Sequence, residues 1–271
     1  MKHTARKRFG QNFLIDHQIT DAIIAAIAPQ RADHLVEIGP GLGALTRPLL
    51  ERVEHLDVVE IDRDIAARLI GEFPASRLTV HNTDALHFDF SALGENLRVV
   101  GNLPYNISSP LLFHLTRFAR CIRDFHLMLQ REVVDRIVAR PSTAPYGRLS
   151  VMLQYRYHVE KLLDVPSHAF RPAPRVESAV IRMRPRAPGE LQATDEALLG
   201  QIVSSAFSQR RKTLRNTLGR FLAREDFAAL GIDSGWRAQN LTCSDFARIS
   251  NYLGNKVGET KTAPLHPLSK A

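Results

Sequence analysis

The sequence predicts a doubly wound, mostly parallel α/β sheet followed by a small all-helical C-terminal domain. Strand-like and helix-like runs alternate between residues 34 and 139, which is typical of parallel strands joined by helices. Strand signals end near residue 185, where the stretch Pro185–Gly189 is rich in Pro and Gly. We therefore expect a first domain over residues 1–186 and a second over residues 187–271.

The elements of the first domain follow from the spacing of apolar residues. Isoleucines at positions 19, 23, 24 and 27 predict a helix that ends before Pro29. The strands predicted after it are His34–Ile38, His55–Ile61, Leu78–His81, Leu97–Val100 and Phe125–Leu129. The helices predicted between and after these strands are Ala44–Arg52, Asp64–Phe73, Pro110–Phe118 and Glu132–Ala139.

Two later strand-like runs, Tyr157–Val165 and Ser178–Met183, have no long helical run between them. Parallel neighbours need a long crossover, so we expect these two strands to extend one edge of the sheet in the antiparallel direction. Beyond the linker, apolar spacing predicts only short amphipathic helices. They are Asp195–Phe207, Lys212–Leu222 and Ser244–Leu253.

Composition narrows the class of protein. Of 271 residues, 36 are Lys or Arg and 28 are Asp or Glu, and the formal charge of +8 favours a polyanionic partner such as nucleic acid over a membrane surface. No apolar run approaches the ~20 residues of a membrane-spanning helix, and the basic start leads into no signal-peptide core. We therefore expect a cytoplasmic protein without membrane association. The two cysteines and 11 histidines lack metal-site spacing, so we expect neither a metal site nor a disulfide.

A glycine-rich turn, Glu37–Gly43, lies where the first predicted parallel strand meets a helix. Its glycines allow the backbone to approach a ligand closely. The spacing is not GxGxxG and Pro40 lacks a backbone donor, so a pyrophosphate cradle is disfavoured. A nucleoside with a short charged tail, such as S-adenosylmethionine, fits better. The alternative is a tight structural turn.

Polar residues end the next three predicted strands. Glu60 follows the glycine turn by about twenty residues, where a carboxylate can accept hydrogen bonds from both ribose hydroxyls. Asp84 can accept from a cofactor adenine, although a turn or helix-capping role is an equal alternative. With Gly39 and Asn102, these residues mark the carboxyl ends of four successive strands, the edge at which open α/β sheets bind ligands.

The motif Asn102–Tyr105 fits methyl transfer to the exocyclic amine of adenine. That nitrogen is a poor nucleophile because its lone pair is delocalised into the ring. The Asn102 side-chain oxygen and the Leu103 carbonyl can accept the two amino hydrogens, while the Tyr105 ring holds the base flat. Pro104 keeps the chain out of a helix here, although an Asx-Pro turn that caps the following helix is the alternative.

Several motifs together resemble the ribosomal RNA adenine N6,N6-dimethyltransferases, and the resemblance covers nearly the whole chain. They are Phe9–Leu14, Val36–Gly43, Asn102–Ile107, Phe170–Ser178 and Arg210–Asn216. The resemblance implies a seven-stranded Rossmann-like S-adenosylmethionine-dependent methyltransferase sheet with a helical C-terminal domain. It is closest to the bacterial small-subunit members, which dimethylate two adjacent adenosines in the 3′-terminal hairpin of 16S rRNA, so the implied partner is 16S rRNA within an immature small ribosomal subunit.

The resemblance also implies roles for individual residues. Asn12, Leu14, Gly39, Glu60, Asp84 and Asn102 would contact S-adenosylmethionine. Asn102, Leu103, Pro104 and Tyr105 would form the catalytic motif, with Tyr105 stacked on the target base and Phe170 as a second aromatic clamp. Physically, Phe170 is more typical of a core residue. Arg175 and Glu177 stand where Lys and Asp are common in the family, so both charges are kept.

A basic segment, Gln209–Arg220, favours RNA binding by the second domain. It contains Arg210, Arg211, Lys212, Arg215 and Arg220 but no acidic residue. A basic arm formed by Lys2, Arg6, Lys7 and Arg8 could add phosphate contacts. A solvated basic helix is the alternative interpretation.

Three competing functions remain open on the sequence. An NAD-binding oxidoreductase would explain the glycine turn and Glu60 but not Asn102–Tyr105. A methyltransferase for DNA adenine or for large-subunit rRNA would use almost the same chemistry. A ribosome-assembly checkpoint factor would act mainly by binding the particle. We expect a monomer, because one active site with successive cofactor exchange is sufficient.

Overall fold

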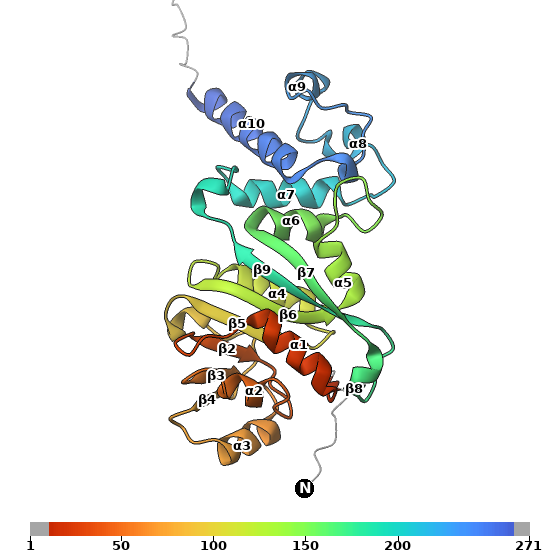
Figure 1. Cartoon of the computed structure of the whole chain (residues 1–271). Coiled ribbons are helices and arrows are strands. Elements are labelled where there is room, and N and C mark those ends of the chain that lie inside the picture. Colours follow the sequence, from red (N-terminus) through yellow and green to blue (C-terminus); the bar gives the residue numbers. More distant parts are fainter. Residues whose placement is uncertain (1–10, 263–271) are drawn as a thin grey trace, which may run out of the picture. The chain divides into compact units, whose positions relative to one another are not determined.

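The structure of the chain is a computed structural model that describes residues 11–262. These residues form two compact units (Figure 1). The first unit contains residues 11–138 and 157–185, and the second contains residues 139–156 and 186–262. The predicted basic arm and the start of the Phe9–Leu14 motif lie outside the described residues.

The first unit is built on one seven-stranded sheet with the order β4-β3-β2-β5-β6-β9-β7. The strands are β2 (Leu35–Ile38), β3 (Leu56–Val59), β4 (Leu78–His81), β5 (Leu97–Asn102), β6 (Ile122–Gln130), β7 (Tyr157–Val165) and β9 (Ser178–Pro185). Strands β4, β3, β2, β5 and β6 are parallel to one another, and β9 pairs antiparallel with both β6 and β7. The predicted parallel sheet and its antiparallel extension are therefore confirmed.

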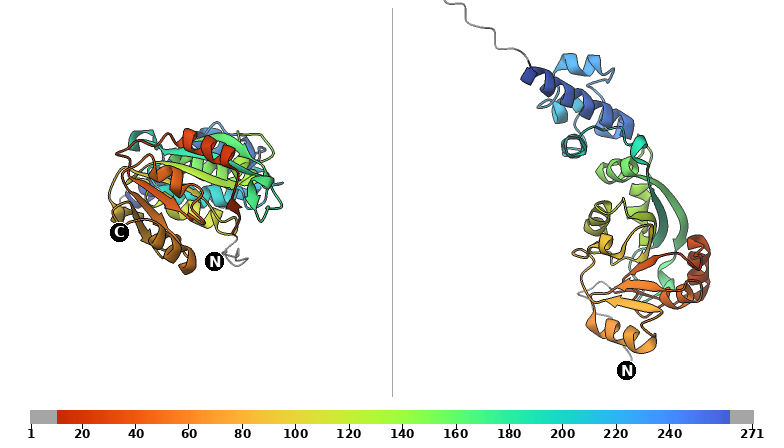
Figure 2. Two further views of the ribbon diagram at one scale, coloured as in Figure 1. Left: turned by 60° about the horizontal axis from the view of Figure 1, so that its bottom comes forward. Right: turned by 90° about the vertical axis from the view of Figure 1, so that its left-hand side faces the viewer.

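Helices cover both faces of this sheet, as Figure 2 shows for α1 and α4. The helices of the first unit are α1 (His17–Ile27), α2 (Thr46–Leu50), α3 (Arg63–Glu72), α4 (Ser108–Thr116) and α5 (Arg131–Ile137). A small separate sheet pairs β1 (Phe13–Leu14) antiparallel with β8 (Phe170–Arg171). This pairing was not predicted, because each strand is only two residues long and its partner is distant in sequence.

The central strands are buried on both faces, as their nearly uninterrupted apolar sequences require. Every residue of β2 and β3 is buried. The isoleucines that predicted α1 pack into the same core cluster as Leu35, Leu56 and Val58. Burial of these side chains is the main favourable term that holds the helices to the sheet.

A buried ion-pair cluster joins the amino ends of β5 and β6 to the end of α1. The Arg98 guanidinium lies 2.6 Å from Asp33 and 3.0 Å from Asp124, and it donates to the Ile27 carbonyl at 2.7 Å. The Arg98 guanidinium therefore pairs with two carboxylates and also donates to a main-chain carbonyl, so its buried charge is compensated. The cluster lies at the amino end of β5, whereas Asn102 lies at its carboxyl end.

The second unit is helical. Its helices are α6 (Arg148–Arg156), α7 (Glu196–Ala206), α8 (Leu214–Leu218), α9 (Arg224–Ala229) and α10 (Cys243–Thr262). A separate core cluster contains side chains from α6, α7, α8 and α10, among them Val151, Ile202, Leu214 and Phe246. The prediction that the C-terminal part of the chain is helical is therefore confirmed.

Three details of the predicted organisation need correction. The boundary at residues 186/187 omits residues 139–156, which belong to the second unit because Tyr146, Val151 and Tyr155 are buried in its core. Helix α6 within this segment and helix α9 were not predicted. The predicted helix Lys212–Leu222 is shorter, since α8 covers only Leu214–Leu218 before Gly219.

Two further observations concern the described residues 11–262. They include no helix long and apolar enough to cross a membrane, and no group of three or more His, Cys, Asp or Glu side chains arranged to hold a metal ion. Cys121 and Cys243 are both free thiols.

We expect Gly101→Ala to destabilise the first unit, because a Cβ at this position of β5 would lie 2.4 Å from the Ile38 carbonyl oxygen on β2. Backbone atoms cannot move aside without separating the two strands, so the free energy of unfolding should fall by about 2–3 kcal/mol or more. Urea denaturation measures this change. Gly71→Ala in α3 is the control, because no atom lies within 4 Å of its added Cβ. It should stabilise the protein by up to about 1 kcal/mol, and an equal effect of the two changes would contradict the prediction.

Candidate active site

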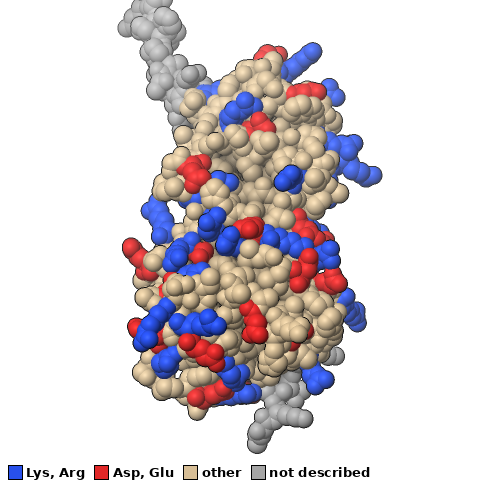
Figure 3. Space-filling view, in the orientation of Figure 1, with Lys and Arg blue, Asp and Glu red and all other residues tan. Residues whose placement is uncertain are grey.

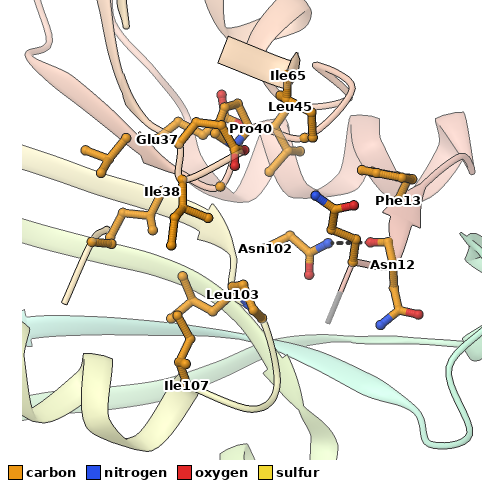
Figure 4. A pocket seen from close by; sticks show the side chains of 18 of the residues that line it. Asn12, Phe13, Glu37, Ile38, Pro40, Leu45, Ile65, Asn102, Leu103 and Ile107 are labelled. Atoms are coloured by element: carbon orange, nitrogen blue, oxygen red, sulfur yellow. Dashed lines mark hydrogen bonds between the residues drawn. The ribbon is translucent and has the colours of Figure 1, made fainter. Parts of the chain in front are cut away.

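One cavity of about 300 Å³ lies at the carboxyl ends of β2, β3, β4 and β5. Its lining comes from segments that are distant in sequence but adjacent in the first unit (Figure 4). Of the residues predicted to bind a cofactor or act in catalysis, the lining includes Asn12, Leu14, Gly39, Glu60, Asp84, Asn102, Leu103, Pro104 and Tyr105. The sheet therefore gathers all the predicted site residues of the first unit except Phe170.

The glycine turn forms one wall of this cavity. Gly39, Gly41 and Gly43 have φ of +67°, +54° and +84°, a left-handed region in which side chains cause strain. A Cβ on Gly41 would lie 3.1 Å from the ring of Phe13, so this glycine also allows β1 to approach the turn. The turn is consequently both tightly bent and covered by the N-terminal segment.

Asn102 is held in a defined orientation at the end of β5. Its side-chain nitrogen donates to the main-chain carbonyl of Asn12 at 3.0 Å (Figure 4). The Asn102 side-chain oxygen takes no part in this bond. The N-terminal segment therefore orients the residue that the sequence singled out for the amine.

Glu60 is 5% exposed, and its carboxylate is bound by the backbone at the end of β3. The Asp62 N–H donates to Oε1 at 2.8 Å, and the Gly41 N–H also contributes. Burial raises the pKa of Glu60 above its ordinary value, while these backbone donors oppose the rise. The carboxylate of Glu60 is therefore buried and fixed at the end of β3.

Glu37 was not given a role from the sequence, yet it lines the cavity and is 1% exposed. Burial raises its pKa to about 7, the Thr46 hydroxyl opposes this by donating at 2.7 Å, and the nearby Glu60 charge adds to the rise. A sequence signal was present, because Glu37 is the only charged residue in the buried strand Leu35–Ile38. The cavity thus contains two buried carboxyl groups.

Asp84 lies in the cavity lining and also caps a turn. It lines the cavity, but its carboxylate also accepts the Leu86 N–H at 2.9 Å and lies 3.5 Å from the exposed His87. The turn-capping role is therefore present in the structure. The Asp84 side chain as a whole is 33% exposed.

Tyr105 is anchored by its hydroxyl group. The phenol oxygen lies 2.5 Å from Ser178 Oγ at the start of β9, and burial raises the pKa of Tyr105. The residue before Ser178 is fixed as well, because Glu177 accepts from the Arg131 main chain at 2.9 Å and from its guanidinium at 2.5 Å. The ring position thus depends on a strand that is 73 residues away in sequence.

Phe170 is not among the residues that line the cavity. It is 3% exposed and packs in the core, where β8 pairs it with Leu14 of β1. Its role as a second aromatic clamp therefore stays a prediction.

Comparisons with known proteins decide the family. A sequence profile described as "Ribosomal RNA adenine dimethylase" matches residues 2–255. The chain belongs to this family. It is similar to the ribosomal RNA small subunit methyltransferase A of Thiobacillus denitrificans, with 62% identity over 254 residues that cover 94% of this chain and 100% of that protein. The corresponding protein of Nitrosospira multiformis is also 62% identical, over 95% of this chain and 99% of its own length.

Solved structures agree on the fold of this ribosomal RNA adenine dimethylase. A dimethyladenosine transferase from Plasmodium falciparum has a TM-score of 0.79 at 24% identity and covers 90% of this chain and 98% of its own. The 23S rRNA methyltransferase ErmE has a TM-score of 0.72 at 26% identity and covers 90% and 100%. The chain is a methyltransferase enzyme, and its cofactor is S-adenosylmethionine.

The cavity fits this cofactor. Its volume is in the range of small-molecule sites, and its lining combines apolar side chains with a few buried polar groups. The absence of an N–H at Pro40 disfavours a pyrophosphate but is compatible with a sulfonium nucleoside. Two buried carboxyl groups also suit a ligand that carries positive charge on its sulfonium and amino groups.

The basic residues predicted to bind RNA lie in the second unit. Arg210, Arg211, Lys212, Arg215 and Arg220 are all exposed. Among residues 11–262, none of them forms an ion pair with a carboxylate, although Arg210 donates to the Ala144 carbonyl and Arg220 lies 4.6 Å from the Phe221 ring centre. On the face in Figure 3, Lys and Arg side chains alternate with Asp and Glu over both units, so this acid-free segment is a local feature.

We expect Glu37→Gln to remove a pH dependence of stability. Between about pH 4.5 and 7, the folded protein holds a proton on Glu37 that the unfolded chain releases, so wild-type stability falls as the pH rises through this window. The variant should match wild type below this range and exceed it by up to about 3 kcal/mol above it. Urea denaturation at a series of pH values measures the difference, and parallel profiles for the two proteins would contradict the prediction.

Proposed function

We propose that this chain transfers methyl groups from S-adenosylmethionine to N6 of two adjacent adenosines in the 3′-terminal hairpin of 16S rRNA, within an immature small ribosomal subunit in the cytoplasm. The observation that carries the proposal is the Asn102 amide, oriented at a cavity of suitable size in a member of the ribosomal RNA adenine dimethylase family. The names of its relatives from Thiobacillus and Nitrosospira support the small subunit as the target.

The residues around the cavity support an assignment of cofactor contacts. Glu60 accepts the ribose hydroxyls and Asp84 accepts the adenine amino group, because both carboxylates lie at strand ends that border the cavity. Asn12, Leu14 and Gly39 enclose the remainder. The cofactor supplies an electrophilic methyl group on a sulfonium sulfur.

The catalytic motif acts by orientation. Asn102 Oδ1 and the Leu103 carbonyl accept the two hydrogens of the target amine, which localises the nitrogen lone pair toward the methyl group. The N–C bond forms as the S–C bond breaks, and the acidic proton on nitrogen then leaves to water. No side chain has to act as a general base, so exclusion of water and alignment provide the acceleration.

Aromatic contacts complete the site in this proposal. The Tyr105 ring stacks on the target adenine, with its hydroxyl group held by Ser178. Pro104 shapes the turn, since its carbonyl accepts the Ile107 N–H at 3.2 Å. Phe170, which β8 pairs with Leu14 of β1, is the second aromatic clamp on the target base. The active form is a monomer in this proposal, because one site with successive cofactor exchange is sufficient.

The second unit binds RNA phosphates of the substrate through five basic side chains, which are Arg210, Arg211, Lys212, Arg215 and Arg220. A target adenine must leave its stack to reach a pocket, so binding elsewhere has to offset the cost of unstacking. The exposure of these side chains and their lack of carboxylate partners within residues 11–262 support this role.

The proposal is tested by incubating the protein with labelled S-adenosylmethionine and undermethylated small subunits. Naked 16S rRNA, 23S rRNA and adenine-rich DNA serve as controls, and the methylated nucleotides are mapped. Paired dimethyladenosines near the 16S 3′ end are the expected result. Label on 23S rRNA or DNA would change the substrate, whereas tight particle binding without methylation would favour an assembly checkpoint factor.

We expect Asn102→Ala to reduce kcat by at least about 100-fold, because the acceptor that aligns the amine is lost. The variant also loses the bond to Asn12, so its stability should fall by about 1 kcal/mol while the fold persists. Methyl transfer under single-turnover conditions measures the first effect and urea denaturation the second. Near-normal turnover in a folded variant would disprove the assigned role.

Two changes at Tyr105 separate the ring from the hydroxyl group. Tyr105→Phe removes the bond to Ser178 but keeps the ring, so only stability should fall, by about 1 kcal/mol. Tyr105→Ala also removes the stacking surface, which is worth about 1–3 kcal/mol, so KM for RNA should rise by about 5- to 150-fold. Urea denaturation measures the stability change, and steady-state kinetics with a cofactor-binding control measures KM for RNA in both variants. Equal KM values for the two variants would argue against stacking.

A further inference from the structure

Three loops of the second unit surround the only tryptophan of the chain, Trp236. They span residues 140–147, 208–215 and 233–240, and we call them together the Trp236 surface. Six basic side chains occur in these loops against one acidic side chain, Asp233. The basic residues, all exposed, are Arg140, Arg210, Arg211, Lys212, Arg215 and Arg237.

Hydrogen bonds join the three loops into one surface. The Leu214 N–H donates to the Trp236 carbonyl at 2.7 Å, and the Arg215 N–H donates to Ser234 at 3.0 Å. The Ser142 N–H donates to the Gln239 carbonyl at 2.7 Å, which connects the first loop to the third. The helices that carry these loops lie together in Figure 1. The positive charges are therefore held near Trp236 by the fold of one unit.

Trp236 itself is 45% exposed. Its bonds to the rest of the loop run through its main chain, since its N–H donates to the Asp233 carbonyl at 3.0 Å and its carbonyl accepts from Leu214. The loop therefore does not need the indole for its hydrogen bonding. A large flat apolar group exposed among cations is a typical arrangement for stacking a nucleobase.

The surrounding charges are available to a ligand. Within residues 11–262, no carboxylate forms an ion pair with Arg140, Arg211, Lys212, Arg215 or Arg237. The one acidic side chain, Asp233, accepts the Gly235 N–H at 2.7 Å and is thereby engaged in its own turn. An anionic ligand would meet several unneutralised cations here.

We propose that the Trp236 surface binds an unpaired nucleotide of the ribosomal RNA substrate, with the base stacked on the indole and the flanking phosphates bound by arginine and lysine. Duplex RNA presents phosphates but no free base face, so the indole selects a loop, a bulge or an end. This inference rests on the proposed function, because it assumes an RNA substrate. It adds a base contact to a unit that would otherwise recognise only charge.

Intrinsic fluorescence tests the contact directly, because Trp236 is the only tryptophan. The full chain is titrated with unmethylated 16S rRNA, with a single-stranded oligoribonucleotide and with an RNA duplex of the same length. Stacking should quench the emission with the first two ligands, and the duplex should quench much less at equal occupancy. Unchanged emission at saturating 16S rRNA would overturn the proposal. Quenching by intact small subunits but not by their RNA would also overturn it, in favour of a protein contact.

Two variants at Trp236 separate stacking from apolar bulk. Trp236→Leu should weaken binding to 16S rRNA by about 5- to 150-fold, and Trp236→Phe should recover most of this loss. Neither change should alter the slope of binding against salt. The double variant Arg211→Gln, Arg215→Gln should instead reduce that slope by about 2, because two phosphate contacts are removed. Wild-type affinity in Trp236→Leu would overturn the proposal.

Methylation assays keep this inference distinct from the proposed function. At saturating 16S particles, Trp236→Leu should retain the wild-type kcat with a raised KM, since the indole lies outside the cavity that binds the cofactor. If wild type methylates 16S rRNA and the variant has an unchanged KM, the stacking proposal fails and the function stands. If wild type methylates no RNA, the function itself fails.

Discussion

The site depends on the pairing of β2 with β5. Strand order reverses at this pair, since β3 and β4 lie on one side of β2 while β5 and β6 lie on the other. Gly101 allows the pair to form, because an added Cβ would collide with the Ile38 carbonyl oxygen. The next residues along the two strands are Gly39 and Asn102, so the pairing brings the glycine turn and the amide together. Crevices at such reversals are the usual ligand sites of open α/β sheets.

Burial of two carboxyl groups beside this crevice has an electrostatic consequence. Burial raises the affinity of both Glu37 and Glu60 for a proton, and repulsion from the Glu60 charge raises that of Glu37 further. A cationic ligand relieves this repulsion and lowers the pKa values of both groups. Binding should therefore release protons near neutral pH, and a neutral ligand of the same shape would lack this advantage.

The sequence predicted the elements whose signals are local and long. Strands β4 and β7 have the predicted bounds, and the glycine turn, Glu60 and Asn102 converge because parallel strands end at one edge. What could not be predicted depends on distant partners. The two-residue strands β1 and β8 exist only through their mutual pairing.

Helix α6 and the two aromatic residues illustrate the same limit. The nine residues of α6 have a weak pattern and become helical by packing into a core supplied by later helices. For Tyr105, sequence indicated a ring at the site but not the hydroxyl bond to Ser178. For Phe170, the apolar side chain indicated a core residue, but its pairing with Leu14 of β1 is a tertiary outcome that local sequence does not encode.

Residues 157–185 of the first unit separate the two parts of the second unit in sequence, and this order has a consequence for synthesis of the chain. Residues 139–156 leave the ribosome before β7 and β9, yet their core partners in α7, α8 and α10 are made last. Apolar side chains such as Val151 and Tyr155 therefore remain exposed to solvent while the sheet is completed, and chaperones can bind them during this period. Deleting the C-terminal helices would leave this exposure permanent, so the helical unit cannot be removed by truncation without harm to the part that remains.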